Sequence, residues 1–430
     1  KMIPAEIIEK KRDGKHLNPN EIKWFINNVV NNKIDTSQLS ALLMAIYFQG
    51  MNDDEMFSLV DAMVNSGEKF NFRHINKYIA DKHSTGGVGD KISLILAPIL
   101  SSLGIAVPMI AGRGLAFTGG TIDKLESIPN FQTSLSMDTF NKQIKNIGCT
   151  ISSQSDKICP ADKILYATRD ITGTVPSLPL ICSSIMSKKI AEDLDGLVID
   201  LKVGSGAFMK TLREAKILGS GLKKIGKAFN IDTEIVYTNM NQPLGNYAGL
   251  RCEILESIDC LNGNGPSDLM EITLELGSKI LMQSKIAKNN QMAIDVMLDS
   301  IENKSALNKF LDIISSQGGD INALIEEKIT KNNSIVIRSK DSGFISSFKT
   351  DEIGWALVEI GAGRKKENDK IDYLAGIEFL NKVGDKVDKG EAIFRIFGKN
   401  IECLNNASIM LQEAYIITKR EVCKDKLIIN

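Results

Sequence analysis

The sequence predicts an α/β protein with a small all-helical domain, a large mostly parallel α/β domain and a C-terminal α+β domain. Three observations lead to this expectation. The first 66 residues show only helical patterns, short apolar runs alternate with amphipathic segments from Tyr78 onward, and short β-rich runs follow Gly319. Strands that alternate with helices are typical of a parallel sheet covered by helices. A chain of 430 residues with 43% hydrophobic content is large enough for two or three packed domains.

The N-terminal region carries the start signals and the spacing of amphipathic helices. Asn18 and Pro19 supply an N-cap and a proline at the first helical position, and apolar residues then recur at helical spacing. Helical patterns return after residue 162 and interrupt the alternating series. We therefore expect a helical domain made of residues 1–66 and 163–193, which forms either a small bundle or a dimer interface.

The alternating region predicts the α/β domain, which we place at residues 78–154 and 194–318. Its predicted strands are 78–81, 106–110, 197–203 and 234–238. The uncharged run 92–111 contains two prolines and predicts a buried helix followed by a buried strand, not a membrane span.

The last part predicts a C-terminal α+β domain over residues 330–430. Its strands are expected at 334–338, 343–348 and 392–397, with a hairpin at 382–391. This hairpin resembles those of biotinyl and lipoyl carriers but lacks the context of their modified lysine, so we interpret the domain as a scaffold.

Charge and cysteine usage exclude several classes of protein. The net charge is −1 and no long basic run is present, which argues against a nucleic-acid partner. The seven cysteines form no Cys-x-x-Cys pair and no zinc spacing, so we expect free thiols, no metal and a cytoplasmic location.

The segment 81–91 is the strongest signal of a binding site. Its three glycines permit a sharp turn between a predicted strand and a predicted helix, where free N–H groups favour an anion. Lys82 and His83 stand just before them. The spacing fits neither a P-loop nor a dinucleotide fingerprint. Phosphate is therefore the expected ligand, and a plain structural turn is the alternative.

A second glycine-rich segment, 112–126, also follows a predicted strand. Thr118 and Thr121 add hydroxyl donors, and Gly119-Gly120 permits close approach of the backbone. Taken alone, it can be another structural turn. Two such loops after neighbouring parallel strands converge at the carboxyl end of the sheet, where ligands bind in this architecture.

A third group of residues lies on predicted helices. Ser184 and Lys188 are four residues apart and share one helical face, and Arg169 ends another helix. Facing a cleft, these side chains can bind a flat polar heterocycle through its carbonyl oxygens. Solvated helix charge is the alternative for each residue taken alone.

Together these segments resemble the thymidine/pyrimidine-nucleoside phosphorylase family. The similarity begins at Lys82-His83-Ser84-Thr85-Gly86-Gly87-Val88-Gly89-Asp90 and spans nearly the whole chain in the expected order. The other segments that carry it are 112–131, 161–162, 167–170, 203–209, 241–245, 263–266 and 361–364.

The resemblance implies a homodimer whose substrates bind between a helical and an α/β domain. It implies a pentosyltransferase in which phosphate attacks a pyrimidine nucleoside, without a cofactor. The implied phosphate-binding residues are Lys82, Ser84, Ser93 and Thr121. The implied base-binding residues are His83, Leu115, Arg169, Ile181, Ser184 and Lys188, of which His83, Arg169 and Lys188 are the expected catalytic groups.

The resemblance leaves the nucleoside open. Met109 is typical of the thymidine-selective branch, whereas the passage 242–245 favours the broad-specificity branch. We expect thymidine to be the favoured substrate, with a broad-specificity uridine/thymidine phosphorylase as the alternative. An anthranilate phosphoribosyltransferase-like transferase and a non-catalytic nucleoside- or phosphate-binding protein are the rival functions.

Three residues depart from the family pattern. Ala111 replaces a serine and removes one phosphate hydroxyl, and Phe117 replaces a histidine near the base. Lys91 stands where members that bind potassium have a hydroxyl residue, although Gly89, Leu244 and Glu256 match the other positions of that cation site. We therefore expect no bound potassium here.

Overall fold

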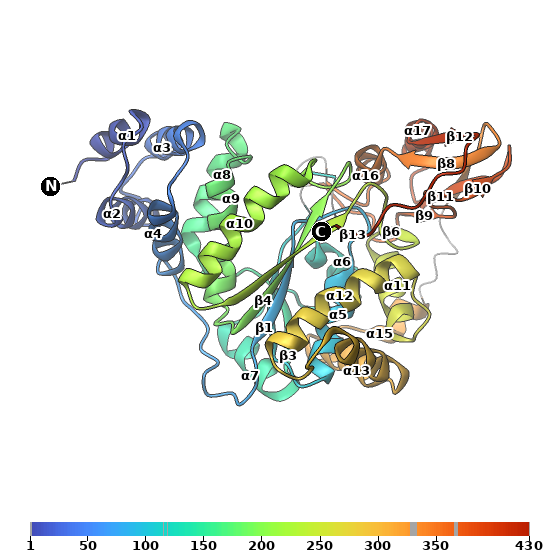
Figure 1. Cartoon of the computed structure of the whole chain (residues 1–430), viewed down its shortest axis with the longest axis horizontal. Coiled ribbons are helices and arrows are strands. Elements are labelled where there is room, and N and C mark those ends of the chain that lie inside the picture. Colours follow the sequence, from blue (N-terminus) through green and yellow to red (C-terminus); the bar gives the residue numbers. More distant parts are fainter. Residues whose placement is uncertain (1, 115, 118, 327–332, 365–368, 430) are drawn as a thin grey trace. The chain divides into compact units, whose positions relative to one another are not determined.

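The computed structural model describes residues 2–114, 116–117, 119–326, 333–364 and 369–429 (Figure 1). The chain divides into two compact units, each formed by segments that are far apart in the sequence. The helical unit comprises Lys1–Ile79, Gln154–Leu197 and Lys216–Thr233, and the α/β unit comprises Ala80–Ser153, Val198–Ala215 and Glu234–Asn430.

The helical unit joins the predicted N-terminal helices to helices from later in the chain. They are α1 (Pro4–Arg12), α2 (Pro19–Val30), α3 (Thr36–Gln49), α4 (Asp53–Val64), α8 (Pro160–Thr172), α9 (Leu178–Ala191) and most of α10 (Leu212–Ala228). Asn18 and Asn52 cap α2 and α4, each within a reciprocal capping box. Apolar side chains of α2, α3 and α4 form one core with Leu165 of α8 and Leu180 of α9.

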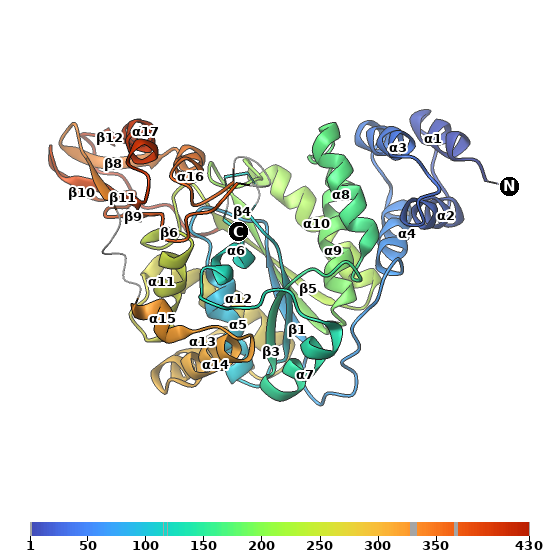
Figure 2. The ribbon, with the colours of Figure 1, turned by 180° about the vertical axis from the view of Figure 1, so that it is seen from behind.

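The α/β unit is built on the sheet β1-β4-β5-β13, whose strands run side by side (Figures 1 and 2). These strands are β1 (Ala80–Ser84), β4 (Gly196–Val203), β5 (Asp232–Asn239) and β13 (Ile428–Ile429). β2 (Val107–Ala111) pairs in parallel with β3 (Cys149–Ser153). The unit's helices before the C-terminal part are α5 (Ile92–Ser102), α6 (Thr121–Glu126), α7 (Met137–Ile147), α11 (Arg251–Leu261), α12 (Ser267–Gln283), α13 (Asn290–Glu302), α14 (Ser305–Ser316) and α15 (Ile321–Glu326).

The C-terminal part of the α/β unit has two small sheets, with strand orders β6-β9-β11-β7 and β10-β8-β12. Their elements are β6 (Tyr247–Gly249), β7 (Asn333–Arg338), β8 (Gly343–Phe348), β9 (Gly376–Phe379), β10 (Lys386–Val387), β11 (Ala392–Gly398) and β12 (Tyr415–Thr418), with the helices α16 (Thr350–Glu359) and α17 (Ile401–Gln412). A hydrophobic core that includes Ile353 and Phe394 joins these layers.

The structure confirms the predicted fold class and corrects two of its details. The segment 382–391 is not a hairpin, because Lys386 and Val387 pair with Phe344 and Gly343 of β8, whereas β11 pairs with β9 and β7. Main-chain bonds between Ile345 and both Gly384 and Asp385 turn the segment toward β8. Strands β3, β6, β9, β12 and β13 were not predicted, since each is short and none alternates clearly.

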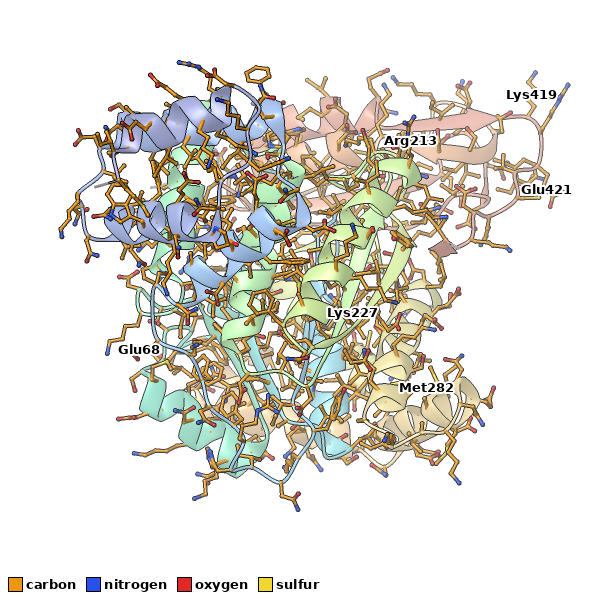
Figure 3. All side chains as sticks on the ribbon, turned by 60° about the vertical axis from the view of Figure 1, so that its left-hand side comes forward. Glu68, Arg213, Lys227, Met282, Lys419 and Glu421 are labelled. Atoms are coloured by element: carbon orange, nitrogen blue, oxygen red, sulfur yellow. The ribbon has the colours of Figure 1, made fainter. Side chains whose placement is uncertain are left out.

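The surface carries exposed charged side chains of both signs. Exposed charged side chains such as Arg213, Lys227 and Glu421 extend outward (Figure 3). Among the described residues, no helix is long and apolar enough to cross a bilayer. The run 92–111 instead forms buried helix α5 followed by buried strand β2, as its prolines predicted.

Candidate active site

The first glycine loop is a strand-to-helix turn, as the sequence predicted. β1 ends at Ser84 and α5 begins at Ile92. Gly86 and Gly89 have φ angles of 89° and 80°, a backbone conformation that favours glycine. A side chain at Gly89 would lie 2.3 Å from the carbonyl oxygen of Leu244, so the loop also needs glycine for close packing.

Three of the predicted phosphate-binding residues meet around the carboxylate of Asp90. The Nζ atom of Lys82 lies 3.4 Å from the Oγ of Ser93 and 3.9 Å from Oδ1 of Asp90. The hydroxyl of Ser84 donates to Oδ2 of Asp90 at 2.5 Å. Only 2% of Lys82 is exposed, and this burial lowers the pKa of Lys82 although Asp90 and Asp200 oppose the change.

Two further lysines approach Asp90, and sequence reasoning gave neither a role. The Nζ atom of Lys202 lies 3.9 Å from the Asp90 carboxylate, and Lys124 donates to the main-chain oxygen of Asp90. Burial disfavours the charge of Asp90, but Lys202 and Lys82 hold the pKa of Asp90 well below its usual range. Asp200 and Lys202 were detectable, because two charged residues alternate on one face of an otherwise apolar strand.

The second glycine loop leads into α6, which begins at Thr121. The amide of Ile122 donates to the carbonyl oxygen of Gly112, closing the loop at 3.2 Å. Lys124 belongs to the same helix and donates to the main-chain oxygen of Asp90. The helix that carries Thr121 is therefore attached to the group formed by Lys82, Ser84, Ser93 and Asp90, which we call the Lys82 cluster. Leu115 and Thr118 lie outside the described residues.

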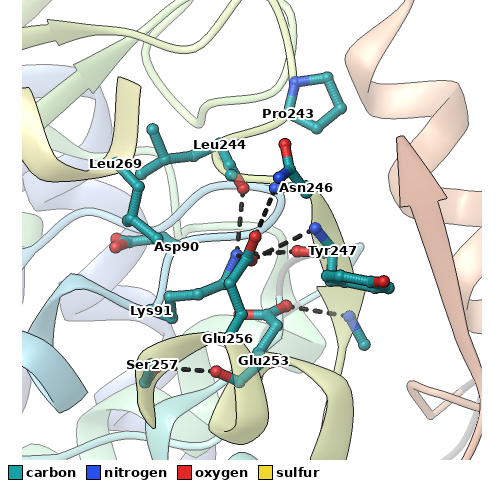
Figure 4. A network of polar contacts seen from close by, with 12 residues as sticks. Asp90, Lys91, Pro243, Leu244, Asn246, Tyr247, Glu253, Glu256, Ser257 and Leu269 are labelled. Carbon is teal, nitrogen blue, oxygen red and sulfur yellow. Dashed lines mark hydrogen bonds and ion pairs between the residues drawn. The ribbon is translucent and has the colours of Figure 1, made fainter. Parts of the chain in front are cut away.

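The ammonium group of Lys91 is enclosed by oxygen atoms (Figure 4). It donates to the carbonyl oxygens of Leu244 and Tyr247 at 3.2 and 2.8 Å, and to the carboxylate of Glu256 at 2.5 Å. Burial disfavours its charge, but Glu256 raises the pKa of Lys91 above its usual value. Glu256 also accepts the main-chain amides of Asn246 and Tyr247, so a charged pair organises this turn.

The predicted base-binding residues of the helical unit lie on α8 and α9. The guanidinium of Arg169 donates to the carbonyl oxygens of Leu180 and Val175, and it lies over the ring of Tyr166. Its Nε atom is buried and has no hydrogen-bond partner among the described residues. Burial lowers the pKa of Arg169. An oriented guanidinium with a spare donor is suited to a carbonyl oxygen of a ligand.

Lys188 is held in place by a residue that sequence reasoning gave no role. Its Nζ atom lies 2.5 Å from Oδ2 of Asp162 and 3.1 Å from the Oγ of Ser184. Asp162 is buried, and its Oδ1 atom has no hydrogen-bond partner in the part of the chain that the structure describes. Ile181 is half-buried and lies one helical turn before Ser184 on α9. The predicted Ser184–Lys188 pair is therefore a fixed hydrogen-bonded arrangement.

The two sets of residues differ in what they can bind. The Lys82 cluster offers an ammonium and hydroxyl groups at a glycine loop, which suits an oxyanion. The Arg169, Ser184 and Lys188 set offers several donors on two helices, which suits carbonyl oxygens of a polar ring. His83 is half-buried at the end of β1, next to Lys82 in the chain.

Comparison with known families covers most of the chain. The "Glycosyl transferase family, helical bundle domain" matches residues 5–67, and the "Glycosyl transferase family, a/b domain" matches residues 76–307. The "Pyrimidine nucleoside phosphorylase C-terminal domain" matches residues 344–418. A solved anthranilate phosphoribosyltransferase from Thermus thermophilus is similar in fold, with a TM-score of 0.57 and 13% identity over 72% of this chain and 99% of that one.

Curated relatives share much more of the sequence. The chain is 46% identical over 397 residues to the pyrimidine-nucleoside phosphorylase of Staphylococcus haemolyticus, which covers 92% of each protein. It is 45% identical over 398 residues to that of Staphylococcus epidermidis, with the same coverage. The chain therefore belongs to the pyrimidine-nucleoside phosphorylase family and is a glycosyl-transferring enzyme of the pentosyltransferase class.

Proposed function

We propose that this enzyme catalyses phosphorolysis of pyrimidine nucleosides and deoxynucleosides, with thymidine favoured. The products are the free base and ribose or deoxyribose 1-phosphate. The observation that carries the proposal is the buried Lys82 ammonium beside Ser93 at a glycine turn, where the hydroxyl of Ser84 bonds to the neighbouring Asp90. The thymidine preference rests on Met109, which is buried on β2.

Each group of residues has a role in this reaction. Breaking the bond between C1′ and the base nitrogen leaves its electron pair on the pyrimidine and positive charge on the sugar. Donors from Arg169 and Lys188 stabilise the departing anion at its carbonyl oxygens, and protonated His83 adds a proton or hydrogen bond. Lys82, Ser84, Ser93 and Thr121 orient the phosphate, whose oxygen forms the new bond to C1′.

The proposal predicts that thymidine releases thymine only when phosphate is present. Thymidine, deoxyuridine and uridine are incubated with and without phosphate, with EDTA in parallel samples, and free base is measured by chromatography. We expect release that saturates with phosphate and does not need Mg²⁺. Absence of release from all three nucleosides at saturating phosphate would contradict the proposal, and a need for Mg²⁺ and a phosphoribosyl pyrophosphate would favour the phosphoribosyltransferase alternative.

We also propose that the Lys91 ammonium makes a bound potassium ion unnecessary. Wild-type activity should be equal in sodium and potassium buffers of the same ionic strength. Lys91→Ser leaves the buried Glu256 carboxylate without its partner, which costs about 3–5 kcal/mol when a buried pair is broken. Potassium or ammonium chloride should therefore raise the melting temperature of Lys91→Ser, whereas choline chloride should not. Specific potassium activation of the wild type would contradict the assignment.

A homodimer is the expected assembly, formed through α3 and α8 of the helical unit. These two helices pack together, and Phe48 near the end of α3 and Ile171 near the end of α8 are 76% and 79% exposed. Met44 and Tyr47 of α3 are also exposed, and several exposed apolar side chains on one helix mark a candidate interface. Phe48→Glu should give monomers in sedimentation experiments, whereas Ile409→Glu, at a C-terminal site that is 71% exposed, should remain dimeric. A Phe48→Glu dimer would exclude this surface.

All seven cysteines are free thiols, which supports the proposed cytoplasmic location.

A further inference from the structure

Phe117 attaches the second glycine loop to the C-terminal part of the α/β unit. The ring is half-buried and packs on the hydrophobic core that contains Ile353 and Leu357. Its centroid lies 5.8 Å from that of Trp355 on α16, and the Nζ atom of Lys210 lies 5.6 Å above it. The residue that departs from the family pattern thus contacts α16.

The contact is close enough to require glycine on the facing helix. A side chain at Gly354 would lie 2.5 Å from Cδ2 of Phe117 and 2.9 Å from its carbonyl oxygen. Both the ring and the main chain of the loop therefore approach α16. Ala116, just before Phe117, has a φ angle of 52°, a conformation that a residue with a side chain adopts only when its surroundings hold it there.

A second attachment lies at the other end of the loop. The guanidinium of Arg364 donates to Oδ1 of Asp123 at 2.9 Å, and Oδ2 of Asp123 accepts the amide of Gly114 at 2.7 Å. Asp123 is 3% exposed and belongs to α6, the helix that begins with Thr121. Arg364 therefore links the loop and α6 to the segment that follows α16.

Between the two attachments the loop does not pack closely on the C-terminal part. A cavity of about 50 Å³ lies there, lined by Gly114, Ala116, Phe117, Asp123, Val358 and Arg364 among others. The described residues of the loop are thus supported at separate points. Removing one point would free part of the loop without opening the core beneath it.

We propose that Phe117 and Arg364 are positioning residues that hold the loop 112–123 in its phosphate-binding conformation. This inference rests on the phosphate site proposed above. The C-terminal part then contributes to the reaction by fixing Thr121 and the glycine amides. Loss of either contact should weaken phosphate binding more than nucleoside binding, because only one of the predicted base-binding residues, Leu115, belongs to this loop.

Phosphate binding can be measured without relying on activity. The chain has two tryptophans, so Trp24→Phe leaves Trp355, beside Phe117, as the only tryptophan fluorophore. Phosphate is titrated into this background and into Phe117→Ala, Phe117→Leu, Arg364→Met and Arg364→Lys, with calorimetry as a second measure. Phe348→Leu is the matched control, because that ring belongs to the same core and packs on Phe394. Melting curves and kinetics accompany each variant.

We expect Phe117→Ala and Arg364→Met each to weaken phosphate binding about tenfold or more, since small displacements of positioning groups have large effects. Phe117→Leu, which keeps apolar bulk, and Arg364→Lys, which keeps the charge, should recover part of this loss. The KM for phosphate should rise severalfold more than the KM for the nucleoside. A purely structural role would instead lower the active fraction and leave both KM values unchanged.

The outcomes separate this inference from the proposed function. Phosphate affinities of Phe117→Ala and Arg364→Met within about twofold of the parent overturn the inference even if phosphorolysis occurs. Weakened binding in these variants supports it even if no base is released. Absence of phosphate binding to the parent protein overturns both.

Discussion

Replacing Lys188 by methionine is expected to lower kcat/KM for thymidine about a hundredfold or more, which corresponds to about 2.7 kcal/mol of transition-state stabilisation. The ammonium is fixed by Asp162 at 2.5 Å and by Ser184 at 3.1 Å, so it is oriented before any substrate binds. A donor in this position strengthens its interaction as charge develops on the base. Steady-state kinetics at saturating phosphate measure the effect.

The same substitution should also destabilise the fold, and this effect can be separated from the loss of catalysis. Methionine leaves the buried carboxylate of Asp162 unpaired, at a cost of about 3–5 kcal/mol. The double variant Asp162→Asn with Lys188→Met removes both charges and should recover much of the melting temperature. Its activity should stay low. If the double variant recovered activity as well as stability, the role of Lys188 would be limited to neutralising Asp162.

Replacing Lys82 by methionine is expected to raise the KM for phosphate at least about tenfold, because a charge-assisted contact contributes about 1.5–3 kcal/mol. Lys82 is buried beside Ser93, and its pKa is lowered by that burial. The ammonium therefore loses its proton at a lower pH than an exposed lysine would. As the pH rises through this lowered pKa, the KM for phosphate should increase in the wild type.

Two comparisons test this assignment. Lys82→Met has no proton to lose, so its phosphate KM should lack the alkaline increase that Lys82 causes in the wild type. Lys142→Met removes an exposed lysine of the same unit and should leave both the KM and its pH profile unchanged. A phosphate KM that is unaltered in Lys82→Met would show that the first glycine loop binds another part of the substrates.

Local patterns predicted most of the fold. Strands β1, β2, β4 and β5 and the helices of the helical unit lie within a few residues of their expected positions, because apolar spacing and capping residues act locally. The failures depend on distant partners. β13 is formed by Ile428 and Ile429, whose pairing with β5 leaves no pattern in their own segment. The segment 382–391 has turn residues that suit a hairpin, but β8 supplies its partner.

The sequence predicted which residue types the candidate site contains, but not which residues pair with one another. The glycine loops and the Ser184–Lys188 spacing identified groups that can bind phosphate and a polar ring. Asp162 belongs to one of the segments that carry the family resemblance, but nothing in the sequence indicates that it neutralises Lys188. The position of Phe117 likewise depends on Gly354 and Trp355, more than two hundred residues away in the chain. Such pairings are decided by tertiary packing.

The pairing of β13 with β5 has a consequence for the order in which the protein is made. β5 is an edge of its sheet until Ile428 and Ile429 add to it, and the amide of Asn239 also needs the carbonyl oxygen of Leu427. During synthesis on the ribosome, this edge must wait for nearly the whole second half of the chain. An open edge can pair with another nascent chain. The closing strand therefore acts as a late safeguard against aggregation, and chains interrupted before residue 427 would be the ones that need a chaperone.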